Sequence, residues 1–187
     1  MDIPLNTLLV ALMFVTILSM GIGNILGSLA DIFNHASPSR RDRVHVGWIV
    51  LVLLVHFNLF WQTKAILDVE DWQFSSFLLA MAGPVLLFFA TSILLTDPPM
   101  EQEPQLGRFF VALGKRFFLM FAVVQAWVVF IGYSISGTLV ATDTVNILFG
   151  ILAVGLALVR GARTQTIGLG LAWALVLLAP ILRWLGA

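Results

Sequence analysis

The 187-residue sequence contains no cysteine, which excludes disulfide bonds, thiolate metal sites and cysteine nucleophiles. Charged residues make up only 11% of the chain, and the formal net charge is zero. With no basic or acidic tail, nothing in the sequence indicates binding to nucleic acid. There is also no H-E-x-x-H motif, no G-x-S-x-G motif and no pair of carboxylates inside an apolar segment. We therefore predict that the protein is not an enzyme.

The histidines and lysines give no support for a bound cofactor. A b-type haem usually needs two histidines inside the membrane, but His35 and His45 flank a loop and only His56 lies within an apolar segment. A retinal Schiff base needs a buried lysine, and Lys64 and Lys115 both lie at the ends of apolar segments. The sequence predicts no metal site and no cofactor.

Apolar residues are abundant instead. They make up 60% of the chain and give a mean hydropathy of +1.01, which is typical of integral membrane proteins. A spanning helix needs about 20 mostly apolar residues. Six stretches qualify, at residues 4–29, 45–67, 72–95, 116–135, 143–159 and 164–185.

These apolar stretches are continuous rather than alternating, which favours helices over barrel strands. We predict one all-α domain over residues 1–187, an integral membrane bundle of six transmembrane helices. The first stretch has no basic residue before it, so we interpret it as a retained span rather than a signal peptide. Within residues 101–115, apolar side chains recur at helical spacing. This segment is either a short amphipathic helix on the membrane surface or an early start of the fourth span.

The basic residues predict how the bundle is oriented. Eight of the ten lie in the connections after the first, third and fifth spans or at their edges, and only Lys64 and Arg183 lie on the other side. Basic residues concentrate on the cytoplasmic side of membrane proteins. Both termini are therefore predicted to be periplasmic. Trp61, Trp72 and Trp184 then fall at the outer interface and Trp48 near the inner one, as in an aromatic belt.

Few polar residues interrupt the spans, and four of them are candidates for a polar path or pore. They are His56, Asn58, Gln62 and Gln125. His56 and Gln125 lie at similar depth, near the middle of their spans. Polar residues at that depth are by default candidates for a functional site. His56 is either a pH-responsive element or a structural tie, bonded to Gln125 or to a backbone carbonyl.

Small residues at a spacing of four indicate places where helices approach closely. They are Ser19, Gly23 and Gly27 in the first span and Ala153, Ala157 and Gly161 in the fifth. Such steps pack helices of one chain, or join the chain to a second copy or to another membrane protein. Pro84, in the middle of the third span, predicts a kink.

Several short motifs in the first half of the chain resemble those of small bacterial multi-pass membrane proteins of unknown function. These are His45-Val46-Gly47-Trp48, Phe60-Trp61-Gln62, Gly83-Pro84 and Asp97-Pro98. The resemblance implies a bacterial inner-membrane protein, and it brings no activity and no binding residues with it.

Two functions fit these observations. The first is a small channel or permease for an ion or small solute, with the second span lining the path. The second is a non-transporting scaffold, sensor or subunit of a membrane complex, in which the polar residues only hold helices together. In both cases the lipid bilayer is the partner that the sequence predicts directly.

Overall fold

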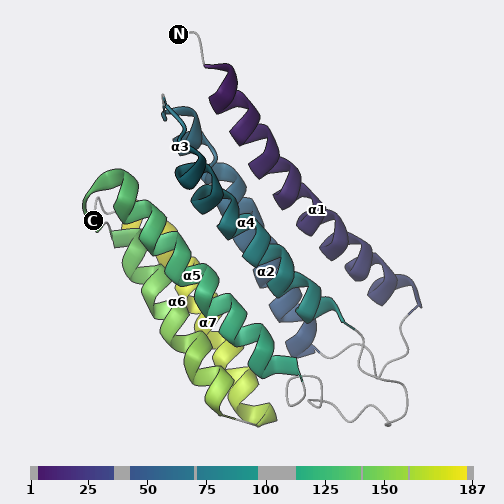
Figure 1. The fold of residues 1–187 in the computed structure, drawn as a ribbon. Coiled ribbons are helices and arrows are strands. Elements are labelled where there is room, and N and C mark those ends of the chain that lie inside the picture. Colours follow the sequence, from purple (N-terminus) through teal and green to yellow (C-terminus); the bar gives the residue numbers. More distant parts are fainter. Residues whose placement is uncertain are drawn as a thin grey trace.

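The computed structural model describes residues 4–35, 43–69, 71–96, 113–139, 141–159 and 161–184. The described residues are almost entirely helical, which confirms the all-α prediction (Figure 1). The helices are α1 (Leu5–His35), α2 (Arg43–Gln62), α3 (Lys64–Leu67), α4 (Phe74–Leu95), α5 (Lys115–Ser136), α6 (Ala141–Leu158) and α7 (Ala162–Trp184).

Length and hydropathy identify the helices that can cross a membrane. Within the described residues four qualify: Leu5–Asn34, Arg43–Leu67, Phe74–Leu95 and Lys115–Ser134. Two shorter apolar helices follow, Asp143–Leu158 and Arg163–Leu178. The chain is therefore an integral, multi-pass membrane protein.

Two helices differ most from their expected bounds. α1 continues to His35, beyond the expected end at residue 29, because backbone hydrogen bonds carry the helix through polar residues after the apolar run ends. The expected helix at 45–67 is divided into α2 and α3 at Thr63, whose N–H donates to the carbonyl of Phe60, three residues earlier (3.1 Å). Most of the predicted amphipathic segment at 101–115 lies outside the described residues.

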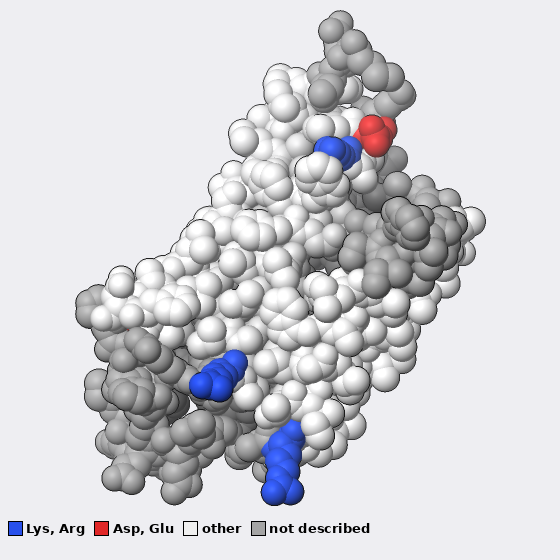
Figure 2. Space-filling model, turned by 180° about the vertical axis from the view of Figure 1, so that it is seen from behind, with Lys and Arg blue, Asp and Glu red and all other residues white. Residues whose placement is uncertain are grey.

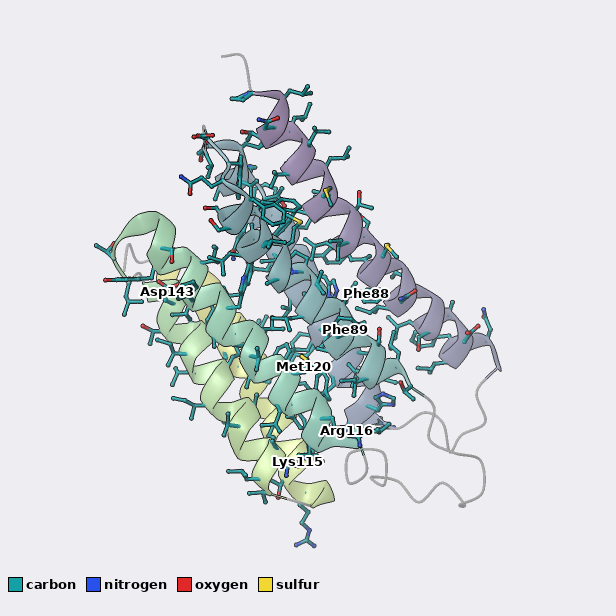
Figure 3. The ribbon with its side chains drawn as sticks, viewed as in Figure 1. Phe88, Phe89, Lys115, Arg116, Met120 and Asp143 are labelled. Atoms are coloured by element: carbon teal, nitrogen blue, oxygen red, sulfur yellow. The ribbon has the colours of Figure 1, made fainter. Side chains whose placement is uncertain are left out.

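The helices form a closed bundle with two distinct ends. α1 packs on α4 and α2, α4 on α5, α5 on α6, α6 on α7, and α7 returns to α2 (Figure 1). At one end α1 begins, α2 leads into α3, and α6 begins; we call this the α3 end. α2, α5 and α7 begin at the opposite end, which carries Arg43, Lys115, Arg116 and Arg163; we call it the basic end. Figure 3 labels Lys115 and Arg116 there.

An aromatic cluster holds together the half of the bundle nearer the basic end. The Trp48 ring lies edge-on to Phe118 and Phe117, with ring centroids 5.1 and 6.1 Å apart. Phe117 stacks on Phe121 (5.7 Å), and Phe121 meets Phe149 of α6 (6.2 Å). Trp48 is 1% exposed, so the expectation that it anchors the chain at the membrane interface is wrong: its ring is part of the core.

The outer faces of the bundle are apolar. Leu12, Ile151 and Leu177 are each at least 60% exposed. In Figure 2 the charged residues lie toward the two ends, and the broad surface between them carries no charge among the described residues. A soluble monomer rarely exposes so much continuous apolar surface. Lipid is the solvent that such a surface fits.

Candidate functional site

His56, the histidine in the middle of α2, is fully buried and faces α1. Its Nδ1–H donates to the carbonyl of Val52 in its own helix (2.9 Å). Its Nε2 lies against Gly21 of α1, where a Cβ atom would overlap the ring. Nε2 has no hydrogen-bond partner among the described residues. The carbonyl that His56 binds belongs to its own helix, so this bond does not tie two helices together.

The other predicted polar-path residues lie on different sides of the bundle. Gln125 is 4% exposed and lies at the contact of α5 with α6. Its Cβ lies 3.6 Å from the position that a Cβ on Gly150 would take. Asn58 is exposed on the outside of α2. Of the two partners considered for His56, Gln125 or a backbone carbonyl, the described structure has the carbonyl. The four residues do not line one continuous path.

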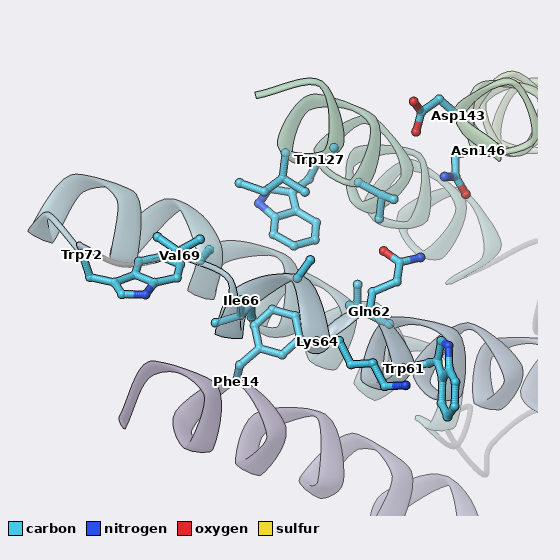
Figure 4. Close-up of a pocket in the computed structure, with 16 residues that line it drawn as sticks. Phe14, Trp61, Gln62, Lys64, Ile66, Val69, Trp72, Trp127, Asp143 and Asn146 are labelled. Carbon is cyan, nitrogen blue, oxygen red and sulfur yellow. The ribbon is translucent and has the colours of Figure 1, made fainter. Parts of the chain in front are cut away.

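Gln62 does reach a pocket, at the α3 end. The pocket has a volume of ≈ 470 Å³ and lies between α1–α4 on one side and α5 and α6 on the other (Figure 4). Most small-molecule sites have volumes of about 300–1,000 Å³ and mainly apolar walls. It reaches the surface at Trp61, Lys64 and Ala65, which are exposed.

The pocket has an apolar body and a polar edge. Phe14, Leu59, Ile66, Val69, Ala80, Trp127 and Val128 are among the residues of the apolar wall. At the polar edge, Asp143 and Asn146 of α6 lie on one side, and Gln62 and Lys64 lie on the other (Figure 4). Asp143 and Asn146 share a face because they are three residues apart in the first turns of α6.

Lys64 and Asp143 carry opposite charges in different surroundings. The Lys64 ammonium lies over the ring of Trp61, 3.8 Å from its centroid, in a cation–π contact at the exposed rim. The Asp143 side chain is 5% exposed. The pocket therefore has its positive charge at the surface and its negative charge in an enclosed position.

Interhelical hydrogen bonds fix the pocket wall. The Nε1–H of Trp127, on α5, donates to the carbonyl of Leu79 on α4 (2.8 Å), in the turn before Pro84. The Thr7 hydroxyl, on α1, donates to the carbonyl of Val69 after α3 (2.8 Å). α4 runs through Pro84 as a single helix, and the kink expected there stays a prediction.

The predicted small-residue steps divide into two groups. Ala153 and Ala157 are buried in α6, as expected for residues that pack helices of one chain, and Gly161 is half-buried just before α7. Ser19, Gly23 and Gly27 are exposed on α1, and a Cβ at either glycine would meet nothing within 4 Å. In the described structure this second group packs no helix of the same chain, so only the assembly role remains for it as a prediction.

Sequence reasoning missed most of the pocket. Trp127 and Phe14 look like ordinary apolar residues of a span, and Trp72 was interpreted only as an interface residue. Asp143 and Asn146 gave a usable signal, since a carboxylate and an amide three residues apart on one helix share a face. The sequence likewise gives no sign that Gly21 and Gly83 are positions where a glycine contacts the side chain of another helix.

Within the described residues, no three His, Asp or Glu side chains come close enough to form a metal site. Comparisons of the chain with family models, with curated proteins and with solved structures found no match. The pocket at the α3 end is a candidate site formed by described residues, and its own side chains are the evidence for its chemistry.

Proposed function

We propose that this integral membrane protein is a small permease, and that the pocket at the α3 end is where it binds its solute. The observation that carries the proposal is the position of the pocket, between α1–α4 and the α5–α6 pair, with polar groups on both sides. A small movement of the two helix groups would open or close such a site. This is the way in which many transporters alternate access.

In this proposal all six long helical segments cross the membrane, α2 and α3 together forming one of them. The basic end faces the cytoplasm of a bacterial cell, so the pocket faces the outside. The distribution of the basic residues along the chain, eight against two, supports this orientation.

Flux through purified protein in liposomes tests the proposal. We expect at least one of sodium, potassium, chloride, glycerol and phenylpropylamine to enter protein-containing vesicles faster than empty ones. Val128→Trp should abolish that flux, because Val128 lines the pocket and a bulky ring would fill it. Val123→Trp is the matched control on the same helix, because Val123 is 50% exposed on the outer surface and does not line the pocket. If no solute in the panel enters faster than into empty vesicles, the permease proposal fails.

The alternative proposal is a non-transporting scaffold, sensor or subunit of a membrane complex. The exposed face of α1 with Ser19, Gly23 and Gly27 favours this function, because small residues facing lipid permit a second helix to approach closely. Absence of flux together with stable assembly in mild detergent would favour it over the permease.

A further inference from the structure

The two charged side chains that line the pocket differ in their exposure to solvent. Asp143 and Lys64 are the charged residues among the described lining residues. Asp143 is nearly enclosed, whereas Lys64 is exposed at the rim. A nearly enclosed carboxylate is screened less by water than an exposed one, so it attracts a nearby cation more strongly. The polar edge of the pocket therefore offers a cation a negatively charged acceptor.

Three indole rings, those of Trp61, Trp72 and Trp127, also line the pocket. The face of an indole ring carries negative potential and attracts a cation within about 6 Å of its centroid. Lys64 already makes such a contact, because its ammonium lies 3.8 Å from the centroid of the Trp61 ring. The same faces repel an anion that approaches along the ring normal.

The apolar wall determines what else the occupant must carry. Phe14, Leu59 and Val128 offer no hydrogen-bonding side chain, so they favour a hydrocarbon or aromatic body. At ≈ 470 Å³ the pocket is large enough for an aromatic ring with a short alkyl chain. Gln62 and Asn146 provide neutral donors and acceptors at the same edge as Asp143.

We propose that the pocket binds organic ammonium cations, with the apolar body against the tryptophan-lined wall and the charged amine at the Asp143 edge. This inference rests on the proposed function, because it names the solute class of that permease. An amine held there would be paired with a carboxylate. The pairing would offset much of the cost of removing the amine from water.

Three matched probes test this preference: phenylpropylamine, phenylpropanol and phenylpropionate, which share a body and differ in charge. Binding is measured by tryptophan fluorescence in phosphatidylcholine nanodiscs, with empty nanodiscs to subtract partition into lipid. We expect the amine to bind about tenfold more tightly than the alcohol, the size of one good cation–π or ion-pair contact. The carboxylate should bind least.

Single substitutions then test which charged side chain gives the preference for the amine. Asp143→Asn should remove the tenfold advantage of the amine over the alcohol, and Asp68→Asn should leave it unchanged. Asp68 is the matched control because it is exposed at the same end of the bundle and does not line the pocket. Lys64→Gln should strengthen amine binding, because it removes the cation that now lies over Trp61, and it should weaken carboxylate binding further.

The outcomes separate this inference from the permease proposal. Amine-selective binding without flux supports the inference and contradicts transport. Flux combined with equal binding of the three probes contradicts the inference and leaves transport intact. Tighter binding of phenylpropionate, lost in Lys64→Gln, would show an anion site and overturn the proposal. If Asp143→Asn does not fold, the opposite effects of Lys64→Gln on the amine and the carboxylate still decide the question.

Discussion

At the scale of single residues, the role of a glycine in this bundle depends on the side chain opposite it. Gly21 faces the His56 ring, whereas Gly23 faces no atom within 4 Å. Both stand in the same span, and large apolar residues lie on its exposed face (Leu12, Met20) as well as on its buried face (Phe14, Leu18). Hydrophobicity therefore does not separate the packed face of α1 from the outer one. For this reason the sequence indicates the row of small residues at Ser19, Gly23 and Gly27, but not that Gly21 is the glycine that contacts another helix.

We predict that Gly21→Ala lowers the free energy of unfolding by about 1–3 kcal/mol, the usual cost of overfilling a packed core. The new methyl group would overlap the His56 ring, which is enclosed between α1 and α2. Thermal or denaturant unfolding in detergent measures the change. Gly23→Ala on the same helix is the control and should not lower stability, because its methyl group meets nothing within 4 Å and alanine is the better helix former.

A double variant identifies the contact behind that cost. In Gly21→Ala/His56→Ala the overlap is gone, so the two substitutions should destabilise less together than the sum of their separate effects. Additive effects would show that Gly21 is required for a reason other than the His56 ring.

At the scale of helices, the α4–α5 contact shapes the pocket wall. Gly83 permits the Trp127 indole to lie directly on the α4 backbone, and the indole N–H then reaches the carbonyl of Leu79. Gly83 precedes Pro84, and this pair was interpreted from the sequence as a kink site. The resulting contact between two helices depends on a ring 44 residues further along the chain, which no local pattern reveals.

Gly83→Ala should therefore act on both stability and binding. A methyl group there would overlap the rigid Trp127 ring and displace it from the wall. We expect a loss of about 1–3 kcal/mol in unfolding free energy and weaker binding of phenylpropylamine. Gly155→Ala on α6, where a Cβ meets nothing within 4 Å, should lower neither stability nor amine binding. Normal amine binding by Gly83→Ala would mean that Trp127 is not part of the site.

At the scale of the whole molecule, the sequence predicted the helices well and the site poorly. Hydrophobic runs locate spans because a membrane imposes length and apolarity on each one separately. The pocket depends instead on which faces of α1–α6 meet, and in an apolar bundle the side chains give little indication of this. Of the four candidate path residues only Gln62 lines the pocket; His56, Asn58 and Gln125 do not.

The sequence contains no cysteine, so the arrangement of the whole molecule in the membrane can be measured by labelling. A single introduced cysteine is then the only maleimide target in this chain, and the solvent accessibility of one position is measured at a time. Three exposed positions suit the purpose: Ala65 at the pocket rim, Ile151 on the apolar outer face of α6, and Arg163 at the basic end.

The central claim is that the pocket opens outward from a bundle embedded in the membrane, and labelling with a membrane-impermeant maleimide tests it most directly. We expect Ala65→Cys to be labelled in intact cells and Arg163→Cys only after the membrane is permeabilised. Ile151→Cys should stay unlabelled until the protein is denatured, because lipid covers it. Labelling of Arg163→Cys in intact cells with Ala65→Cys silent would reverse the orientation, and labelling of native Ile151→Cys would contradict the embedded bundle.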